Sequence, residues 1–363
     1  GVLQIPQPPF FRLERKLVMG QTMVCGQPGL GPVRLEQNPD QLALLGDLLA
    51  PVTGEVNNFG VYGAKTVHLL APGYGNEQGL YAVPPTANPY FVRFASSPST
   101  TILADAMAKN PTFFTLWIGN NDVLGYALTG GLGDTITSPQ WFQAYLGMIL
   151  QTLTSNGAKG AIANIPSVTS IPFFNTVPYN GLVLSSQAQV DGLNAAYSQL
   201  GITFNLGQNP FIIADATSPA GLRQIKNTEL ISLAVSQDSL TCGGWGSMKP
   251  IPEQYTLNES EINNISSAIQ SYNQIISDFA NQMGLAYVDV YSELILAENG
   301  IVIDGVSLST ELVTGNTFSL DGVHLTPVGN AYVANLFIRA INEKFGATLP
   351  LVNITEYDAV ILP

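Results

Sequence analysis

The sequence has few charged residues and very few cysteines or histidines. Charged side chains make up 11% of the 363 residues, and 26 acidic residues against 13 basic ones give a formal net charge of −13. Phosphate backbones repel a chain with that charge, so a nucleic-acid partner is not expected. With two cysteines and two histidines, His68 and His324, a structural zinc site is nearly excluded. We expect no metal and no cofactor.

Long hydrophobic runs are also missing. No apolar stretch approaches the roughly 18 residues that a membrane-spanning helix needs, so we expect no such helix. The first residues, Gly1-Val2-Leu3-Gln4, have no methionine and no basic leader, a start that suggests a processed or engineered amino terminus. A surface of uncharged polar residues, with 35 glycines and 24 prolines, is commoner in exported proteins. Cys25 and Cys242 would form a single disulfide in an oxidising compartment, but their spacing does not decide this.

Hydrophobic residues make up 46% of the chain, enough for a sizeable core. Predicted strands alternate with predicted helices, which favours a parallel sheet with helices on both faces. We expect one domain over residues 1–363, with an irregular part at 1–56 and an insertion around 202–256. The expected strands are 112–118, 160–165 and 285–290, and the expected helices are 99–109, 139–155, 185–200, 258–283 and 326–345, with a loop or hairpin region at 299–320.

The strongest chemical signal is Asp321-Gly-Val-His324, just before the last predicted helix. A carboxylate three residues ahead of a histidine is able to fold onto ring atom Nδ1, which leaves Nε2 free to deprotonate a nucleophile. Taken alone, the pattern more often marks a turn.

Two weaker signals precede it. Asn121, in Gly119-Asn-Asn-Asp122, follows a buried strand, where its amide is able to donate to a developing oxyanion; Asp122 would hold the loop through backbone N–H groups. Gly63 follows a glycine-rich stretch that begins at Asn57 and offers a second N–H donor. An ordinary Asx turn and a plain glycine-rich loop are the alternatives.

Together, in this order, the three motifs resemble the SGNH (GDSL-type) serine hydrolases, whose blocks are Gly-Asp-Ser, Asn…Gly, Gly-x-Asn-Asp and Asp-x-x-His. The resemblance spans roughly residues 57–345 and implies a flavodoxin-like three-layer α/β/α fold. It implies that His324 is the general base, Asp321 its orienting partner, and Asn121 and Gly63 the oxyanion donors. Exported bacterial esterases and lipases are the most similar members in overall character.

The family's first block has no counterpart here, because no serine precedes Ser96. Thr22, in a stretch that superficially mimics the block, and Cys25 are two weak candidates for the nucleophile. We expect instead that the serine lies N-terminal to Gly1. Because that block belongs to a central strand, something must fill its place: the upstream segment, as part of the chain or as a retained peptide, or a replacement strand such as 15–19.

The sequence therefore predicts an ester hydrolase that acts on a small-molecule, glycan or lipid ester through an acyl-serine intermediate. The alternative is a catalytically inactive binding protein that keeps the fold, for example for carbohydrate.

Overall fold

The computed structural model describes residues 16–18, 22–24, 27–29, 34–36 and 50–360. Its centre is a parallel sheet of β5 (Phe113–Leu116), β6 (Lys159–Ala163) and β13 (Ala286–Val288), in the order β13-β6-β5. Ile162 of β6 lies opposite Leu116 on one side and Tyr287 on the other. The three strands follow one another in the chain and in space, as expected when helices connect parallel neighbours.

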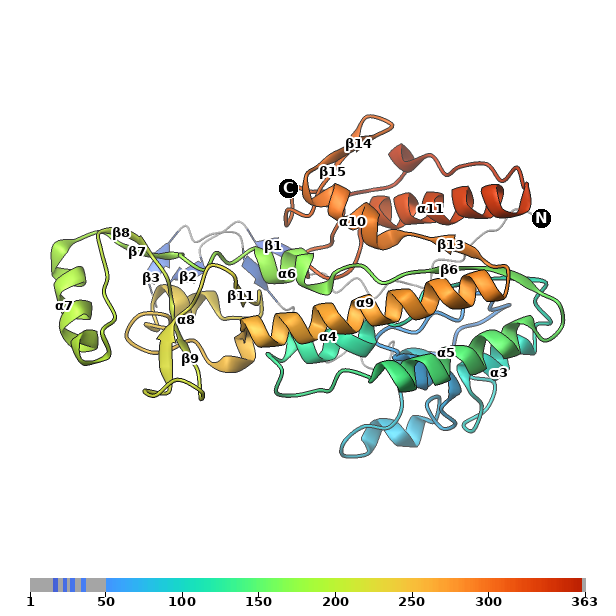
Figure 1. Ribbon diagram of the computed structural model, residues 1–363, viewed down its shortest axis with the longest axis horizontal. Helices are drawn as coiled ribbons and strands as arrows, with labels where there is room; N and C mark the ends of the chain where they lie inside the picture. The colour runs from blue at the N-terminus through green and yellow to red at the C-terminus, as the bar shows by residue number, and fades with distance from the viewer. Residues whose placement is uncertain (1–15, 19–21, 25–26, 30–33, 37–49, 361–363) are drawn as a thin grey trace.

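Helices cover both faces of this sheet (Figure 1). On one face lie the long helices α5 (Pro139–Thr154) and α9 (Glu259–Gln282), with α3 (Ile102–Met107) and α4 (Asn121–Leu128) beside them. On the other face lies α11 (Pro327–Phe345), with α10 (Val290–Glu298) next to it. The predicted three-layer α/β/α fold with a parallel sheet is confirmed.

Two hydrophobic cores hold the layers together. Between the sheet and α5/α9, the rings of Phe142 and Tyr272 stack with centroids 4.0 Å apart. Between the sheet and α11 the strands contribute small side chains such as Ala161 and Ala286, which let the helix pack closely. Burial of these apolar surfaces is the main source of the fold's stability.

The long helices begin and end where the sequence predicts. Asn258 caps α9 in a reciprocal capping box with Glu261. Thr326 caps α11, where its Oγ1 accepts a hydrogen bond from Gly329 N at 3.0 Å, and Pro327 occupies the first helical position. Gly346 ends α11 in the left-handed conformation, at φ 60°.

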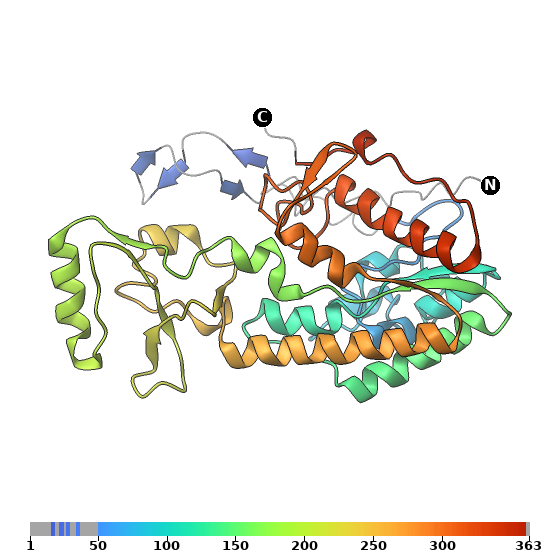
Figure 2. The ribbon, with the colours of Figure 1, turned by 45° about the horizontal axis from the view of Figure 1, so that its top comes forward.

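A lobe of short elements projects from one end of the body (Figures 1 and 2). It packs its own small cores, one around Tyr197 and Phe204 and one around Phe211 and Ile251. The lobe includes α7 and therefore begins earlier than the predicted insertion at 202. Its elements are β7 (Leu182–Leu184), α7 (Gln187–Tyr197), β8 (Gly207–Asn209), β9 (Ile212–Ala214), β10 (Leu222–Gln224), β11 (Leu230–Ile231), α8 (Gln237–Thr241) and β12 (Thr256–Leu257).

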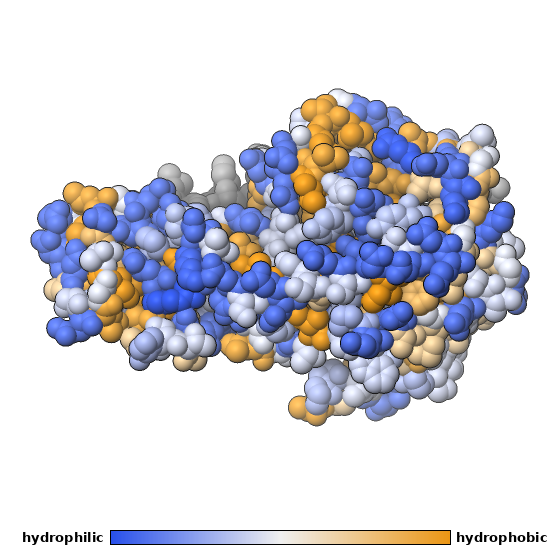
Figure 3. All heavy atoms as spheres, viewed as in Figure 1, coloured by the Kyte–Doolittle hydropathy of each residue, from blue (hydrophilic) through white to orange (hydrophobic). Residues whose placement is uncertain are grey.

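The remaining elements are short. β14 (Ile301–Ile303) and β15 (Val306–Leu308) form a hairpin within the predicted 299–320 region, and α2 (Pro89–Val92) and α6 (Pro172–Asn175) are single turns. Figure 3 shows apolar residues at the surface over this hairpin, where Val302 is 68% exposed. None of the described helices is both long enough and apolar enough to cross a membrane.

The N-terminal strands lie apart from the central sheet. β1 (Lys16–Val18) pairs with β4 (Arg34–Glu36), and β2 (Thr22–Val24) pairs with β3 (Gln27–Gly29), both antiparallel. The suggestion that residues 15–19 replace a strand of the parallel sheet is therefore wrong: residues 16–18 hydrogen-bond to β4 instead. Residue 15 and Cys25 lie outside the described residues.

Strand β5 has an open side. Among the described strands it pairs with β6 alone, so its other backbone edge has no strand beside it. Its side chains toward the α11 face are only partly covered: Thr115 is exposed, and Phe113 is 38% exposed although its ring contacts that of Phe345 in α11, with centroids 5.7 Å apart. A parallel strand is normally buried on both faces, and of the three strands of this sheet β5 has the most exposed side chains.

Candidate active site

Asp321 and His324 form a hydrogen-bonded pair in the loop before α11. Asp321 Oδ2 lies 2.7 Å from His324 Nδ1. The other oxygen, Oδ1, accepts hydrogen bonds from Ser319 Oγ at 2.7 Å, from Val323 N at 2.8 Å and from His324 N at 2.9 Å. One carboxylate therefore folds the loop with one oxygen and orients the imidazole with the other.

These contacts also keep the carboxylate ionised. Partial burial raises the pKa of Asp321, but the His324 ring and the N–H groups of His324 and Val323 outweigh burial and hold that pKa well below its ordinary range. An ionised Asp321 requires a proton on His324 Nδ1. Nε2 is then the basic nitrogen.

Gly322, between the two residues, anchors the loop to the body. Its φ is +70°, and a Cβ there would lie 2.8 Å from the backbone nitrogen of Phe173 in α6. Phe173 N donates to Gly322 O at 3.0 Å. Only glycine fits this close contact, which fixes the pair relative to the sheet.

Asn121 and Asp122 begin α4 directly after the loop that follows β5, and they hold the Gly63 loop. Asn121 Nδ2 donates to Ala64 O at 3.0 Å. Asp122 Oδ2 accepts from both Thr66 N and Thr66 Oγ1, each at 2.8 Å, and Asp122 is fully buried. Asp122 thus accepts a hydrogen bond from a backbone N–H, as predicted. That N–H belongs to Thr66, three residues after Gly63.

Two donors of this region remain available. A side-chain amide carries two hydrogens, and Asn121 uses one of them on Ala64 O. Gly63, at φ +74°, makes no hydrogen bond with its N–H among the described residues. Glycine suits this position because of its left-handed backbone conformation and not because of space, since a Cβ there would meet nothing within 4 Å.

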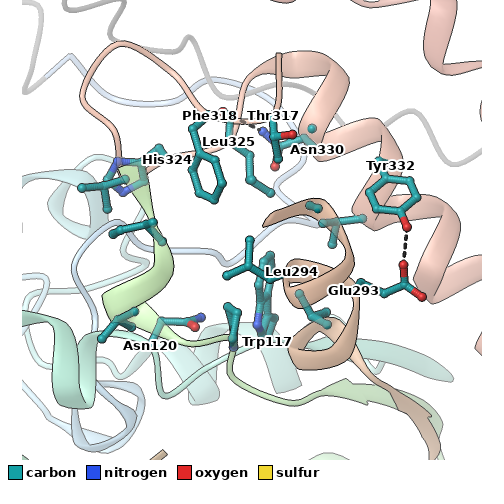
Figure 4. A pocket seen from close by; sticks show the side chains of 18 of the residues that line it. Trp117, Asn120, Glu293, Leu294, Thr317, Phe318, His324, Leu325, Asn330 and Tyr332 are labelled. Atoms are coloured by element: carbon teal, nitrogen blue, oxygen red, sulfur yellow. Dashed lines mark hydrogen bonds between the residues drawn. The ribbon is translucent and has the colours of Figure 1, made fainter. Parts of the chain in front are cut away.

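Three of the four predicted residues line one cavity. It has a volume of about 300 Å³ and is lined by Gly63, Asn121 and His324, with Asp321 behind His324. Figure 4 shows His324 at one end and the Glu293–Tyr332 hydrogen bond at the other, with Leu294 and Phe318 between them. The cavity lies where strands β5, β6 and β13 end, the usual position of a site in a parallel sheet.

The sequence did not reveal several residues of this cavity. Trp117 and Asn120 line its floor, and Leu294 and Glu293 come from α10. Trp117 is fixed by a hydrogen bond from Nε1 to Asn164 O at 3.1 Å. Trp117 and Leu294 carried no local signal, because buried aromatic and aliphatic residues look alike in a sequence whether they line a core or a cavity.

The other candidates lie elsewhere. His68, in the short helix η2 (Thr66–Leu70), does not line the cavity. Its ring stacks on that of Tyr74, and its Nδ1 accepts a hydrogen bond from Lys65 N. Burial lowers the pKa of His68. Thr22 lies in β2, which pairs with β3 and is not a strand of the parallel sheet. Within the described ranges no group of histidine, cysteine and acidic residues is arranged to hold a metal ion.

Comparison with known proteins identifies the class. The profile of the GDSL-like Lipase/Acylhydrolase family matches residues 37–337, most of the chain, in agreement with the α/β/α fold and the motif order described above. The chain belongs to this family, and membership supports a general esterase or acylhydrolase function. No curated protein and no solved structure matches the chain significantly.

Proposed function

We propose that the protein is a carboxylic ester hydrolase that works through an acyl-serine intermediate. The observation that carries the proposal is the hydrogen bond between Asp321 Oδ2 and His324 Nδ1, at a cavity that also holds the amide of Asn121 and the N–H of Gly63. A general base and two neutral donors are the groups that acyl transfer needs apart from its nucleophile.

Each group has one role in the proposed reaction. The serine Oγ attacks the ester carbonyl carbon while His324 Nε2 takes its proton, and His324 Nδ1–H keeps donating its hydrogen bond to Asp321 Oδ2. The carbonyl oxygen becomes an oxyanion that accepts from Asn121 Nδ2 and Gly63 N–H. When the tetrahedral adduct collapses, the alcohol leaves with the proton from Nε2. Water then attacks the acyl carbon while His324 Nε2 takes a proton from it. When this second adduct collapses, the bond to the serine Oγ breaks, Nε2 returns the proton to Oγ and the acid leaves.

We further propose that the serine comes from a segment N-terminal to Gly1. No hydroxyl or thiol among the described residues is hydrogen-bonded to the His324 ring, whose one polar contact is Asp321. The open edge of β5 supports the proposal, because a parallel strand placed there would end beside Asn121 and the cavity. A helix after such a strand would cover Thr115, which is exposed, and the part of Phe113 that Phe345 leaves exposed. We also propose that the protein is exported, because a composition rich in uncharged polar residues, glycine and proline is commoner in exported proteins.

The test compares p-nitrophenyl acetate hydrolysis by the full-length gene product, by its His324→Ala variant, and by a chain that begins at Gly1. We expect activity in the first alone, and partial recovery when the upstream segment is added to the third as a separate peptide. Equal rates for the full-length protein and His324→Ala would refute the esterase and favour the non-catalytic binding protein. Full, His324-dependent activity of the chain from Gly1 would place the nucleophile within these 363 residues.

A further inference from the structure

Tyr62 stacks on the ring of His324. The two ring centroids are 4.5 Å apart and the planes are inclined by 27°. Tyr62 also contacts the ring of Tyr90, with centroids 5.2 Å apart. The backbone of Tyr62 is held as well, because Asn88 Nδ2 donates to Tyr62 O at 2.9 Å. A fixed aromatic ring thus covers one face of the imidazole.

The stack supplies a restraint that Asp321 does not. The hydrogen bond from Nδ1 fixes one atom of the imidazole, but it leaves the ring plane free to tilt about that contact. The His324 side chain is 45% exposed, so surrounding packing restricts it little. The ring of Tyr62 against the imidazole face limits this tilt and so keeps Nε2 in a fixed direction. The electron-rich face of Tyr62 also favours the imidazolium that forms when Nε2 accepts a proton.

We propose that Tyr62 is a positioning residue for His324, and that it acts through the ring face and not through its hydroxyl group. The catalytic part of this inference rests on the proposed esterase function. The same residue precedes Gly63, so one turn of the chain places both the stacked ring and an oxyanion donor. Movement of the Gly63 loop would therefore displace the general base and the donor together.

The kinetic test compares the full-length protein with its Tyr62→Ala and Tyr62→Phe variants. Loss of one aromatic pair corresponds to a fall in kcat of roughly three- to tenfold for Tyr62→Ala. KM for p-nitrophenyl acetate should change less than kcat, because the restraint on the His324 ring acts on proton transfer, although Tyr62 also lines the cavity. Tyr62→Phe, which keeps the ring, should restore kcat. Tyr81→Ala is the matched control, since Tyr81 is 70% exposed and does not line the cavity.

A spectroscopic test does not depend on activity. His68 and His324 are the two histidines in these 363 residues, so histidine-selective labelling gives a simple NMR spectrum in which His324→Gln assigns the site. Stacking shields the His324 ring protons. Their resonances should move downfield in Tyr62→Ala and stay in place in Tyr62→Phe, while His68, stacked on Tyr74, serves as the reference.

The outcomes separate the two proposals. Unchanged His324 resonances in Tyr62→Ala would overturn the stacking and with it the positioning role. A resonance shift without a fall in kcat would overturn the positioning role alone. Absence of hydrolysis by the wild-type protein would refute the esterase and the catalytic half of the inference, while the NMR spectra would still decide whether the rings stack. A Tyr62→Phe variant as impaired as Tyr62→Ala would assign the effect to the hydroxyl group and contradict the inference.

Discussion

Replacing Asp321 by asparagine should abolish most activity while leaving the loop folded. Oδ1 accepts three hydrogen bonds, from Ser319 Oγ, Val323 N and His324 N, so an asparagine at this position will place its own oxygen there. Its NH2 group then faces His324 Nδ1. Because NH2 donates, Nδ1 must accept, and the ring proton moves to Nε2, which is no longer a base.

The kinetic effect should far exceed the structural one. In serine proteases the same exchange lowers kcat by about 10⁴, which corresponds to about 5.4 kcal/mol of activation free energy. Loss of the negative charge weakens the hydrogen bonds to residue 321, and we expect the free energy of unfolding to fall by about 1 to 3 kcal/mol. Asp304→Asn is the matched control. Asp304 lies at the β14–β15 turn with φ +51°, a conformation that asparagine also adopts.

The assay is p-nitrophenyl acetate hydrolysis by the full-length protein, with the melting temperature of each variant measured in parallel. Histidine NMR reports the tautomer directly, through the nitrogen that carries the proton. An Asp321→Asn variant with kcat within threefold of wild type would refute the assigned role of Asp321. A variant that fails to fold would show that the loop, rather than the chemistry, depends on the charge, and the control Asp304→Asn would still fold.

Three further predictions concern the surrounding structure. Asn121→Ala removes an oxyanion donor and the bond to Ala64, so kcat should fall by about 10² to 10³ in the same assay, and an unchanged kcat would contradict the role of the amide. Asn258→Ala removes the cap of α9 and should lower the free energy of unfolding by about 1 kcal/mol in urea titrations, with no change in kcat; a loss of kcat would link the cap to the site. Gly119→Ala would place a Cβ 2.5 Å from Ile165, at φ +113°, and should lower that free energy by at least about 2 kcal/mol; a neutral effect would mean that this turn relaxes.

The sequence predicted the parts of the fold whose signals are local. The helices predicted at 258–283 and 326–345 match α9 and α11; the capping box with Glu261 and the left-handed Gly346 were found in the structure. α10 was missed because it is short and apolar around most of its circumference, so it has no clear helical periodicity. Within the lobe, the helix predicted at 185–200 corresponds to α7, but the strands, of two or three residues each, were not predicted.

In the candidate site, too, the sequence predicted contacts between nearby residues and missed those between distant ones. Asp321 and His324 are three positions apart, and the hydrogen bond between them could be expected from the spacing. The Tyr62–His324 stack joins positions far apart in the chain, and no pattern in either neighbourhood indicates it. Gly63 and Asn121 were proposed from the order of the motifs; that Asn121 contacts Ala64 required the folded chain. The catalytic roles of these residues stay predictions.

The attachment of the Gly63 loop to α4 has a consequence for how activity is lost. Asn121 and Asp122 together bind Ala64 and Thr66, so neither oxyanion donor keeps its place if these contacts break. Partial loosening of the loop should therefore not produce a population with intermediate turnover. In increasing denaturant, we expect each molecule to be either fully active or inactive. The fraction of active molecules should fall in one sharp transition.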